Sequence, residues 1–163
     1  MVTKYWLQPA ETITFLLEET KDTSAIQIYT DGSKPEKGVG AGIAISISGD
    51  LVKTLKYKLN KRYTNNQAEQ LGILKALQHM VNVHAEIKTA TIYTDSRMTL
   101  DSLQNANIHT ALVDEIRLQL TEMKEMQWHT QFCWVKGHVG VQGNETADTL
   151  AKEAATSVDT PEC

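Results

Sequence analysis

Cysteine and proline are scarce in this chain, and their scarcity excludes several classes of protein. Only two cysteines, Cys133 and Cys163, and three prolines occur among 163 residues. Two cysteines are too few for a disulfide scaffold, and they do not have the spacing of zinc ligands. We expect Cys133, inside an apolar run, to be a reduced core thiol and Cys163 to be a free terminal thiol. The length and the hydrophobic content of 41% are typical of one globular domain.

Long apolar runs are missing as well. No segment approaches the ~20 apolar residues that a helix needs to cross a bilayer. Residues 1–9 lack the charged-then-apolar pattern of a secretory signal. We therefore expect no contact with a membrane and an intracellular location, in the cytoplasm or the nucleus.

An excess of basic residues is the third absence. Lysine and arginine number 16 against 20 aspartates and glutamates, which gives a formal net charge of −4. Proteins that hold nucleic acid through its phosphates are normally basic. Composition by itself therefore predicts weak unaided binding to nucleic acid, and would not suggest a nucleic-acid enzyme.

Hydrophobic periodicity predicts an α/β fold with the element order β-β-β-α-β-α-α-β-α. The strands are expected from residue 26 to the turn at Asp31-Gly32, and over residues 39–47, 51–59, 89–93 and 128–135. The helices are expected over residues 64–81, 96–104, 109–126 and from 142 or 144 onwards. A meander followed by crossover units gives a mixed five-stranded sheet with helices on both faces. Two local signals support this order: a hairpin turn at residues 48–50 and a capping box formed by Thr64 and Gln67.

Four acids stand out because each lies inside an extended motif. They are Asp31 in Tyr-Thr-Asp-Gly-Ser, Glu69 in Thr-Asn-Asn-Gln-Ala-Glu, Asp95 in Tyr-Thr-Asp-Ser, and Asp148 in the last helix after a glycine-rich loop. Each acid alone is also typical of a turn, a cap or a first helical turn. Asp31 and Asp95 follow strands whose carboxyl ends would meet at the switch point of the sheet, where ligands bind.

With these motifs in their order, the chain resembles the type 1 ribonuclease H family, and most closely the ribonuclease H domains of retroelement reverse transcriptases of the LINE-type, non-LTR class. The resemblance covers about residues 25–157. Residues 1–24 are then expected to be a linker or docking segment, and residues 158–163 a flexible tail. The resemblance implies a ribonuclease H-like fold and an endoribonuclease that hydrolyses the RNA strand of RNA–DNA hybrids. Its task would be to remove template RNA during reverse transcription. The expected partners are the hybrid and an upstream reverse transcriptase domain, with a monomer when the domain is isolated.

The resemblance also implies a metal site. Asp31, Glu69, Asp95 and Asp148 would hold two Mg²⁺ ions, for which Mn²⁺ can substitute. Asp31 would bridge both ions, Glu69 and Asp95 would complete the leaving-group side, and Asp148 would help to hold the water-activating ion. His138, in the glycine-rich loop, would handle protons or assist release of metal and product.

Substrate contacts are implied for the segment before Glu69. Arg62 and Thr64 would contact a phosphate of the DNA strand. Asn65 and Asn66 would hydrogen-bond in the minor groove, where RNA displays its 2′-hydroxyls. Thr64 also reads as a helix cap, and the two roles are compatible because a capped helix terminus presents N–H groups to phosphate.

Two alternatives stay open at this point. One is a catalytically weak or inactive domain that binds hybrid or connects other domains of a retroelement polyprotein; such a domain would be expected to lose at least one of the four acids. The other is a different nuclease of the same superfold. Integrases place the glutamate last of three acids, and proofreading exonucleases place one two residues after the first aspartate, where this chain has Ser33.

Overall fold

The computed structural model describes residues 21–135, 142–158 and 161–162. Along these residues the elements follow the predicted order. The strands are β1 (Ile26–Ser33), β2 (Val39–Ile47), β3 (Asp50–Leu59), β4 (Thr89–Thr94) and β5 (His129–Trp134). The helices are α2 (Asn65–Val81), α3 (Arg97–Gln104), α4 (Ala111–Glu125) and α5 (Gln142–Thr156).

The five strands form one mixed sheet in the order β3-β2-β1-β4-β5. β1 pairs antiparallel with β2, and β2 antiparallel with β3. β4 lies parallel to β1 on its other side and to β5. The predicted ribonuclease H-like α/β fold is therefore confirmed, and the carboxyl ends of β1 and β4 are adjacent.

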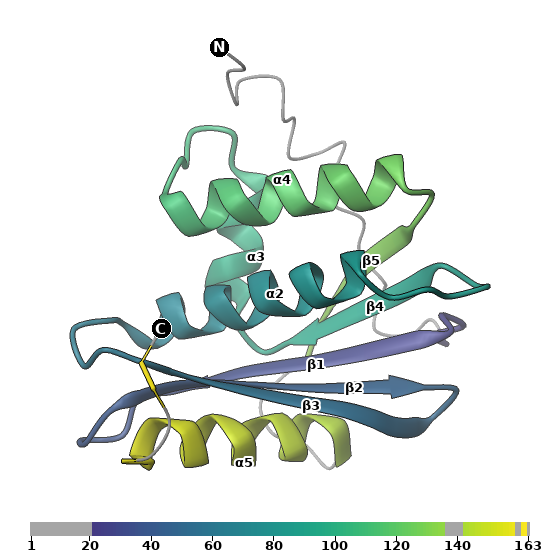
Figure 1. Cartoon of the computed structure of the whole chain (residues 1–163). Coiled ribbons are helices and arrows are strands. Elements are labelled where there is room, and N and C mark those ends of the chain that lie inside the picture. The colour runs from purple at the N-terminus through teal and green to yellow at the C-terminus, as the bar shows by residue number, and fades with distance from the viewer. Residues whose placement is uncertain (1–20, 136–141, 159–160, 163) are drawn as a thin grey trace.

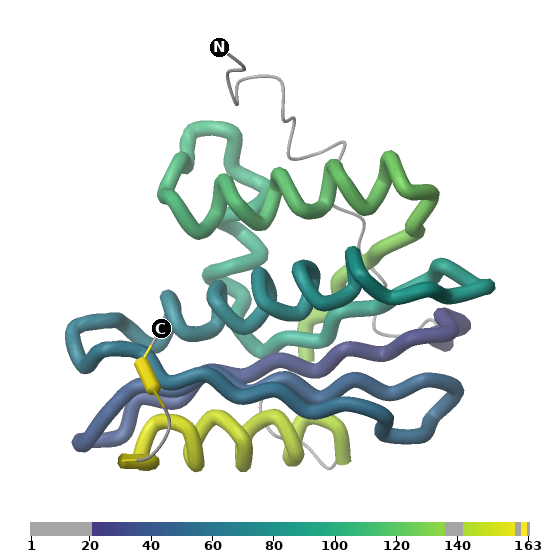
Figure 2. The backbone as a smooth tube through the Cα atoms, in the orientation of Figure 1, coloured from purple at the N-terminus to yellow at the C-terminus, as the bar shows by residue number. Residues whose placement is uncertain are grey.

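Helices cover both faces of the sheet (Figure 1). α2, α3 and α4 lie on one face, where α2 packs over β1 and β2, and α4 reaches β5. The main core lies between these layers; among its fully buried side chains are Ile28, Leu77, Ile92, Ile116 and Phe132. Of the described helices, α5 is the one on the opposite face, where it runs along β1, β2 and β3 (Figure 2).

Local signals placed the ends of the elements to within a residue or two. Ser48 and Gly49 both have positive φ angles, 52° and 86°, as a two-residue hairpin turn requires. The capping box at Thr64 is present in full. The helices predicted to begin at residues 96 and 109 begin at Arg97 and Ala111, because Ser96 and Thr110 accept backbone N–H bonds as N-caps and so stand outside the helices.

α5 approaches β2 unusually closely, and glycine makes this approach feasible. A Cβ atom on Gly40 or Gly42 would collide with the backbone carbonyl oxygen of Ala151 or Ala147 on α5. The facing side of α5 is correspondingly built from buried alanines. Backbone thus packs against backbone at this interface, which sets the height of α5 above the sheet.

Residues near the two ends of the domain bond to its strands. Ser24 Oγ and Asp22 Oδ1 both lie within hydrogen-bond distance of Thr91 Oγ1 on β4, at 2.7 and 2.9 Å. Glu162 forms an isolated parallel bridge with Lys58 on β3. Cys133 is buried and forms no disulfide with another described residue, as expected for a core thiol, while Cys163 lies outside the described residues. Over the residues that the structure describes, no helix is both long and apolar enough to cross a membrane.

Candidate active site

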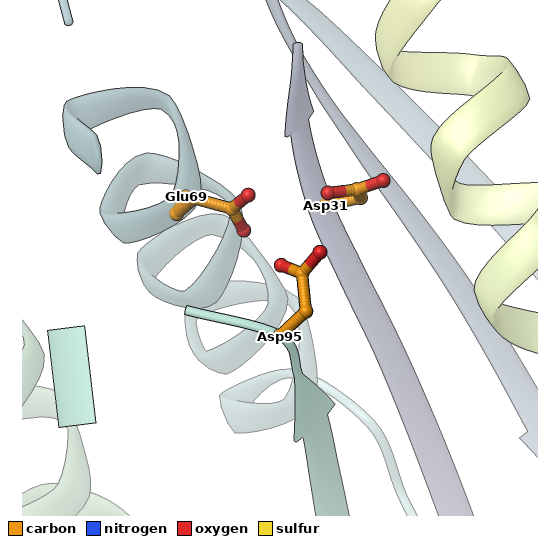
Figure 3. Close-up of side chains that lie close together, drawn as sticks. All are labelled: Asp31, Glu69 and Asp95. Atoms are coloured by element: carbon orange, nitrogen blue, oxygen red, sulfur yellow. The ribbon is translucent and has the colours of Figure 1, made fainter. Parts of the chain in front are cut away.

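Three of the predicted acids converge at the carboxyl end of β1. Asp31, Glu69 and Asp95 each offer a carboxylate oxygen, and these oxygens lie within 4.8 Å of one another (Figure 3). Asp31 and Glu69 are buried, with 5% and 3% of their surface exposed, and Asp95 is half-buried. The side chains come from β1, α2 and the residue after β4. Three elements distant in sequence therefore build one acidic cluster.

Gly32 allows Glu69 to reach this cluster. A Cβ atom on Gly32 would lie 2.9 Å from the backbone nitrogen of Glu69, so any side chain there would push α2 away from β1. The backbone N–H of Gly32 also donates a 2.9 Å hydrogen bond to Asp31 Oδ1, which orients that carboxylate. Glu69 lies in the second turn of α2 rather than in its first, so the helix dipole at the N-terminus does not explain it.

Asp95 is held through its backbone. The indole N–H of Trp134, the last residue of β5, donates a 3.1 Å hydrogen bond to the Asp95 carbonyl oxygen. The Arg97 guanidinium lies over the Trp134 ring, 5.1 Å from its centroid. The turn that carries Asp95 is therefore fixed between the ends of β4 and β5.

Asp148 lines a groove beside the end of β1, which carries Asp31. It belongs to the second turn of α5, not the first, because the helix begins at Gln142. Its carboxylate is 2.9 Å from the Lys152 Nζ atom one turn later. Asp148 and Lys152 line the groove together with Gly32, Ser33 and Asn65. The fourth acid thus faces the end of β1 from the other side of the sheet.

The cluster is electrostatically unfavourable for three carboxylates without cations. Burial, followed by the nearby charges of Asp31 and Asp95, raises the pKa of the Glu69 carboxyl well above its ordinary value of 4.5. Glu69 Oε2 is also buried and has no hydrogen-bond partner among the described residues. Converging carboxylate oxygens with an unsatisfied atom are the donor set that hard divalent cations prefer. The residues present therefore fit a divalent metal site.

The raised pKa of Glu69 predicts how stability depends on pH. Between pH 4.5 and its raised pKa, the folded carboxyl keeps a proton that the unfolded chain has lost, so this group's contribution to stability is present at low pH and declines as pH rises. In EDTA, the Tm advantage of Glu69→Gln over the unmodified chain should therefore grow between pH 5 and pH 8. Added Mg²⁺ should raise the Tm of the unmodified chain more at pH 8 and should have little effect on Glu69→Gln. A Tm difference that does not change with pH would contradict this assignment.

The predicted substrate residues lie at the start of α2, the helix that carries Glu69, and just before it. Arg62 is exposed, with its guanidinium 5.9 Å from the Tyr63 ring centroid. Thr64 is exposed and caps α2, and Asn65 is exposed on the groove that contains Asp148. Asn66 is half-buried; its Oδ1 accepts hydrogen bonds from the hydroxyls of Ser96 (3.2 Å) and Thr99 (3.0 Å). The side-chain oxygen of Asn66 therefore ties α2 to the start of α3. The side-chain NH2 group of Asn66 remains to contact a ligand. His138 lies outside the described residues.

The comparisons with known proteins agree with this geometry. A family model described as RNase H matches residues 23–156. The chain belongs to the ribonuclease H family. Among its relatives, the ribonuclease H of Bartonella bacilliformis is 32% identical over 157 residues, which cover 86% of this chain and 94% of the relative. The ribonuclease H of Francisella tularensis subsp. novicida is 32% identical, covering 85% and 95% of the two chains, and that of Chromohalobacter salexigens is 29% identical, covering 85% and 89%.

Sequence reasoning missed three residues that support this ribonuclease H site. Gly32 follows the pattern of a turn, but its lack of a side chain lets Glu69 approach. Trp134 ends a predicted strand, and its bond to the Asp95 carbonyl depends on pairing between β4 and β5. Lys152 could have been found, because a lysine four residues after an aspartate on a helix commonly pairs with it.

Proposed function

We propose that the chain is an endoribonuclease that hydrolyses the RNA strand of RNA–DNA hybrids by two-metal-ion catalysis. The observation that carries the proposal is the convergence of Asp31, Glu69 and Asp95 in a chain of the ribonuclease H family. Buried carboxylates this close together are costly unless cations offset them. A divalent metal site explains why the fold brings them together.

The four acids divide between the clustered three and Asp148 on α5. Asp31, Glu69 and Asp95 would hold divalent cations, two Mg²⁺ or Mn²⁺ ions in the full site, and Asp148 would add a ligand from α5. When bound, such ions supply an activated water and stabilise the leaving oxygen of an in-line phosphodiester displacement. His138 is proposed to handle protons next to Asp148.

The substrate would lie across the start of α2. Arg62 is exposed and free to reach a DNA phosphate, and Thr64 caps a helix whose N–H groups favour an anion. Asn65 and the amide group of Asn66 would meet the minor groove, where a 2′-hydroxyl distinguishes RNA from DNA. The Ser96 and Thr99 hydroxyls hold Asn66 in place for this contact.

We also propose a biological setting, in which residues 25–157 are the ribonuclease H domain of a LINE-type retroelement reverse transcriptase and remove copied template RNA. Residues 1–24 would join an upstream polymerase, and residues 158–163 would be a tail. The connection between α3 and α4, residues 105–110, contains no lysine or arginine that could grip hybrid independently. The domain would act inside the cell, in cytoplasm or nucleus, and would be monomeric in isolation.

The test is cleavage of a strand-labelled RNA–DNA hybrid in Mg²⁺, beside RNA–RNA and DNA–DNA duplexes of the same sequence. We expect cutting of the RNA strand in the hybrid only, with loss of cutting in EDTA and in an Asp95→Asn variant. The products should carry a 5′-phosphate and a 3′-hydroxyl. Intact hybrid binding with no cutting at high protein concentration would instead support a hybrid-binding or connecting domain.

A further inference from the structure

The tripeptide Tyr-Thr-Asp occurs twice in the chain and places two tyrosines beside the catalytic acids. Tyr29 precedes Asp31 by two residues, and Tyr93 precedes Asp95 by two. Tyr29 and Tyr93 are direct partners in the parallel register of β1 and β4. Their rings stack, with centroids 4.8 Å apart and planes inclined by 11°. A stacked aromatic pair therefore lies immediately below the acidic cluster.

The first turn of α5 rests on this pair. A Cβ atom on Gly143 would collide with three carbon atoms of the Tyr29 ring, so only glycine lets the helix lie this close. Gly143 is in the first turn of α5, and Asp148 is in the next turn. The close approach to β2 at Gly42 and Gly40 begins only at Ala147, one residue before Asp148, so the turn that leads into Asp148 rests on Tyr29. The Tyr29 ring is thus the support for the start of the helix.

The other ring of the pair is held by the segment that precedes the sheet. Asp22 Oδ2 accepts a 2.5 Å hydrogen bond from the Tyr93 hydroxyl. Asp22 Oδ1 accepts from Thr91 Oγ1 and from the Ser24 backbone N–H, each at 2.9 Å. Gln131 on β5 donates a further 2.9 Å hydrogen bond to Thr91 Oγ1. Asp22 is therefore bound at three points to a fully buried threonine, a tyrosine and its own turn.

We propose that Asp22, Tyr93 and Tyr29 form a positioning chain that sets the first turn of α5 and, through it, Asp148. Tyr29 carries the helix, and Asp22 holds Tyr93 so that the stack keeps its place. Asp22, which precedes the first strand, thereby influences the position of the Asp148 carboxylate on α5. The inference rests on the proposed function, since Asp148 is assigned there as a metal ligand.

The chemical consequence follows from the geometry of a metal ligand. A misplacement of about 1 Å in a catalytic group can cost roughly a hundredfold in rate. Loss of the Tyr29 ring would let the first turn of α5 move toward β1, which would move Asp148 relative to Asp31. Metal affinity and the catalytic step would then suffer, whereas hybrid binding at Arg62 and Thr64 would not.

The decisive variants differ in what remains of the ring. Tyr29→Leu should lower kcat by about tenfold, weaken Mn²⁺ binding measured by titration calorimetry by several-fold, and leave the KM for hybrid within about twofold. Tyr29→Phe keeps the ring against Gly143 and should restore all three values. Tyr57→Leu on β3 is the matched control, because it removes a half-buried tyrosine ring that lies against Lys75 of α2, on the face of the sheet opposite α5 (Figure 1); it should change Tm only.

The link to Asp22 has its own test, which does not depend on Tyr29 variants folding. Tyr93→Phe and Asp22→Ala should each weaken Mn²⁺ binding, and the double variant should weaken it by less than the sum of the two single effects, because the two substitutions share the Tyr93–Asp22 hydrogen bond. The inference would be overturned if the Tyr93 and Asp22 substitutions had additive effects on Mn²⁺ affinity. It would also be overturned if Tyr29→Leu and Tyr93→Phe bound Mn²⁺ within twofold of the unmodified chain. Failure of the unmodified chain to cleave hybrid would instead count against the proposed function, and the Mn²⁺ isotherms would still decide the positioning role.

Discussion

Asp31→Asn is expected to reduce the cleavage rate by at least about a thousandfold while making the folded domain more stable. Asp31 is the central acid of the cluster, and a metal site that loses it forfeits several kcal/mol of transition-state stabilisation, at 1.36 kcal/mol for each factor of ten. The opposite effect on stability arises because Asp31 contributes to the raised pKa of Glu69. Without divalent cations, removal of its charge relieves repulsion worth about 1–2 kcal/mol, or a Tm increase of about 2–8 °C.

Single-turnover cleavage of hybrid and thermal unfolding in EDTA measure the two effects on the same sample. Asp50→Asn is the matched control, because Asp50 is exposed and lies at the opposite end of the sheet from Asp31. Asp50 pairs with Ile47, which in turn pairs with Ile26 at the start of β1. It should change neither quantity. Loss of activity together with loss of stability in Asp31→Asn would show that Asp31 is structural and that the acids do not repel one another.

Gly42→Ala is expected to destabilise the domain by at least about 3 kcal/mol, a large effect for one methyl group. The added Cβ would collide with the Ala147 carbonyl oxygen and lie 2.6 Å from the Ala151 backbone nitrogen and 2.9 Å from Leu150 Cβ. These neighbours are mostly backbone, so they cannot turn aside as a flexible side chain could, and α5 must move away from β2. Because α5 carries Asp148, activity should fall as well.

The same substitution at Gly72 is the control. A Cβ there would meet Thr30 and Ala41 at ordinary contact distances of 3.7 and 3.8 Å. Gly72 lies within α2, where alanine is preferred to glycine by up to about 1 kcal/mol, so Gly72→Ala should be neutral or stabilising. Chemical denaturation of both variants gives the comparison. Equal losses at the two positions would mean that the α5–β2 contact is not the tight one described.

Most of the fold could be predicted because its signals are local. The capping box of Thr64 and Gln67 and the hairpin turn at Ser48 and Gly49 depend on residues within a few positions of one another. The helical spacing of Val113 and Ile116 on α4 is likewise a local signal, and both residues are fully buried. The errors at helix starts were also local, since a capping side chain and a helical residue share the same pattern and differ only in backbone angle.

The sequence alone predicted the four acids, since each lies in its own motif, and it predicted the order of strands and helices that the structure has. Only the tertiary structure decided how the acids are arranged: Asp31, Glu69 and Asp95 lie together, and Asp148 on α5 is paired with Lys152. It also decided that Gly32 must be small for Glu69 to reach Asp31, and that the Tyr29 ring supports α5. The reason is that such requirements depend on atoms contributed by segments far apart in the chain. No periodicity or cap can encode a contact that exists only after the sheet has formed and the helices have packed on it.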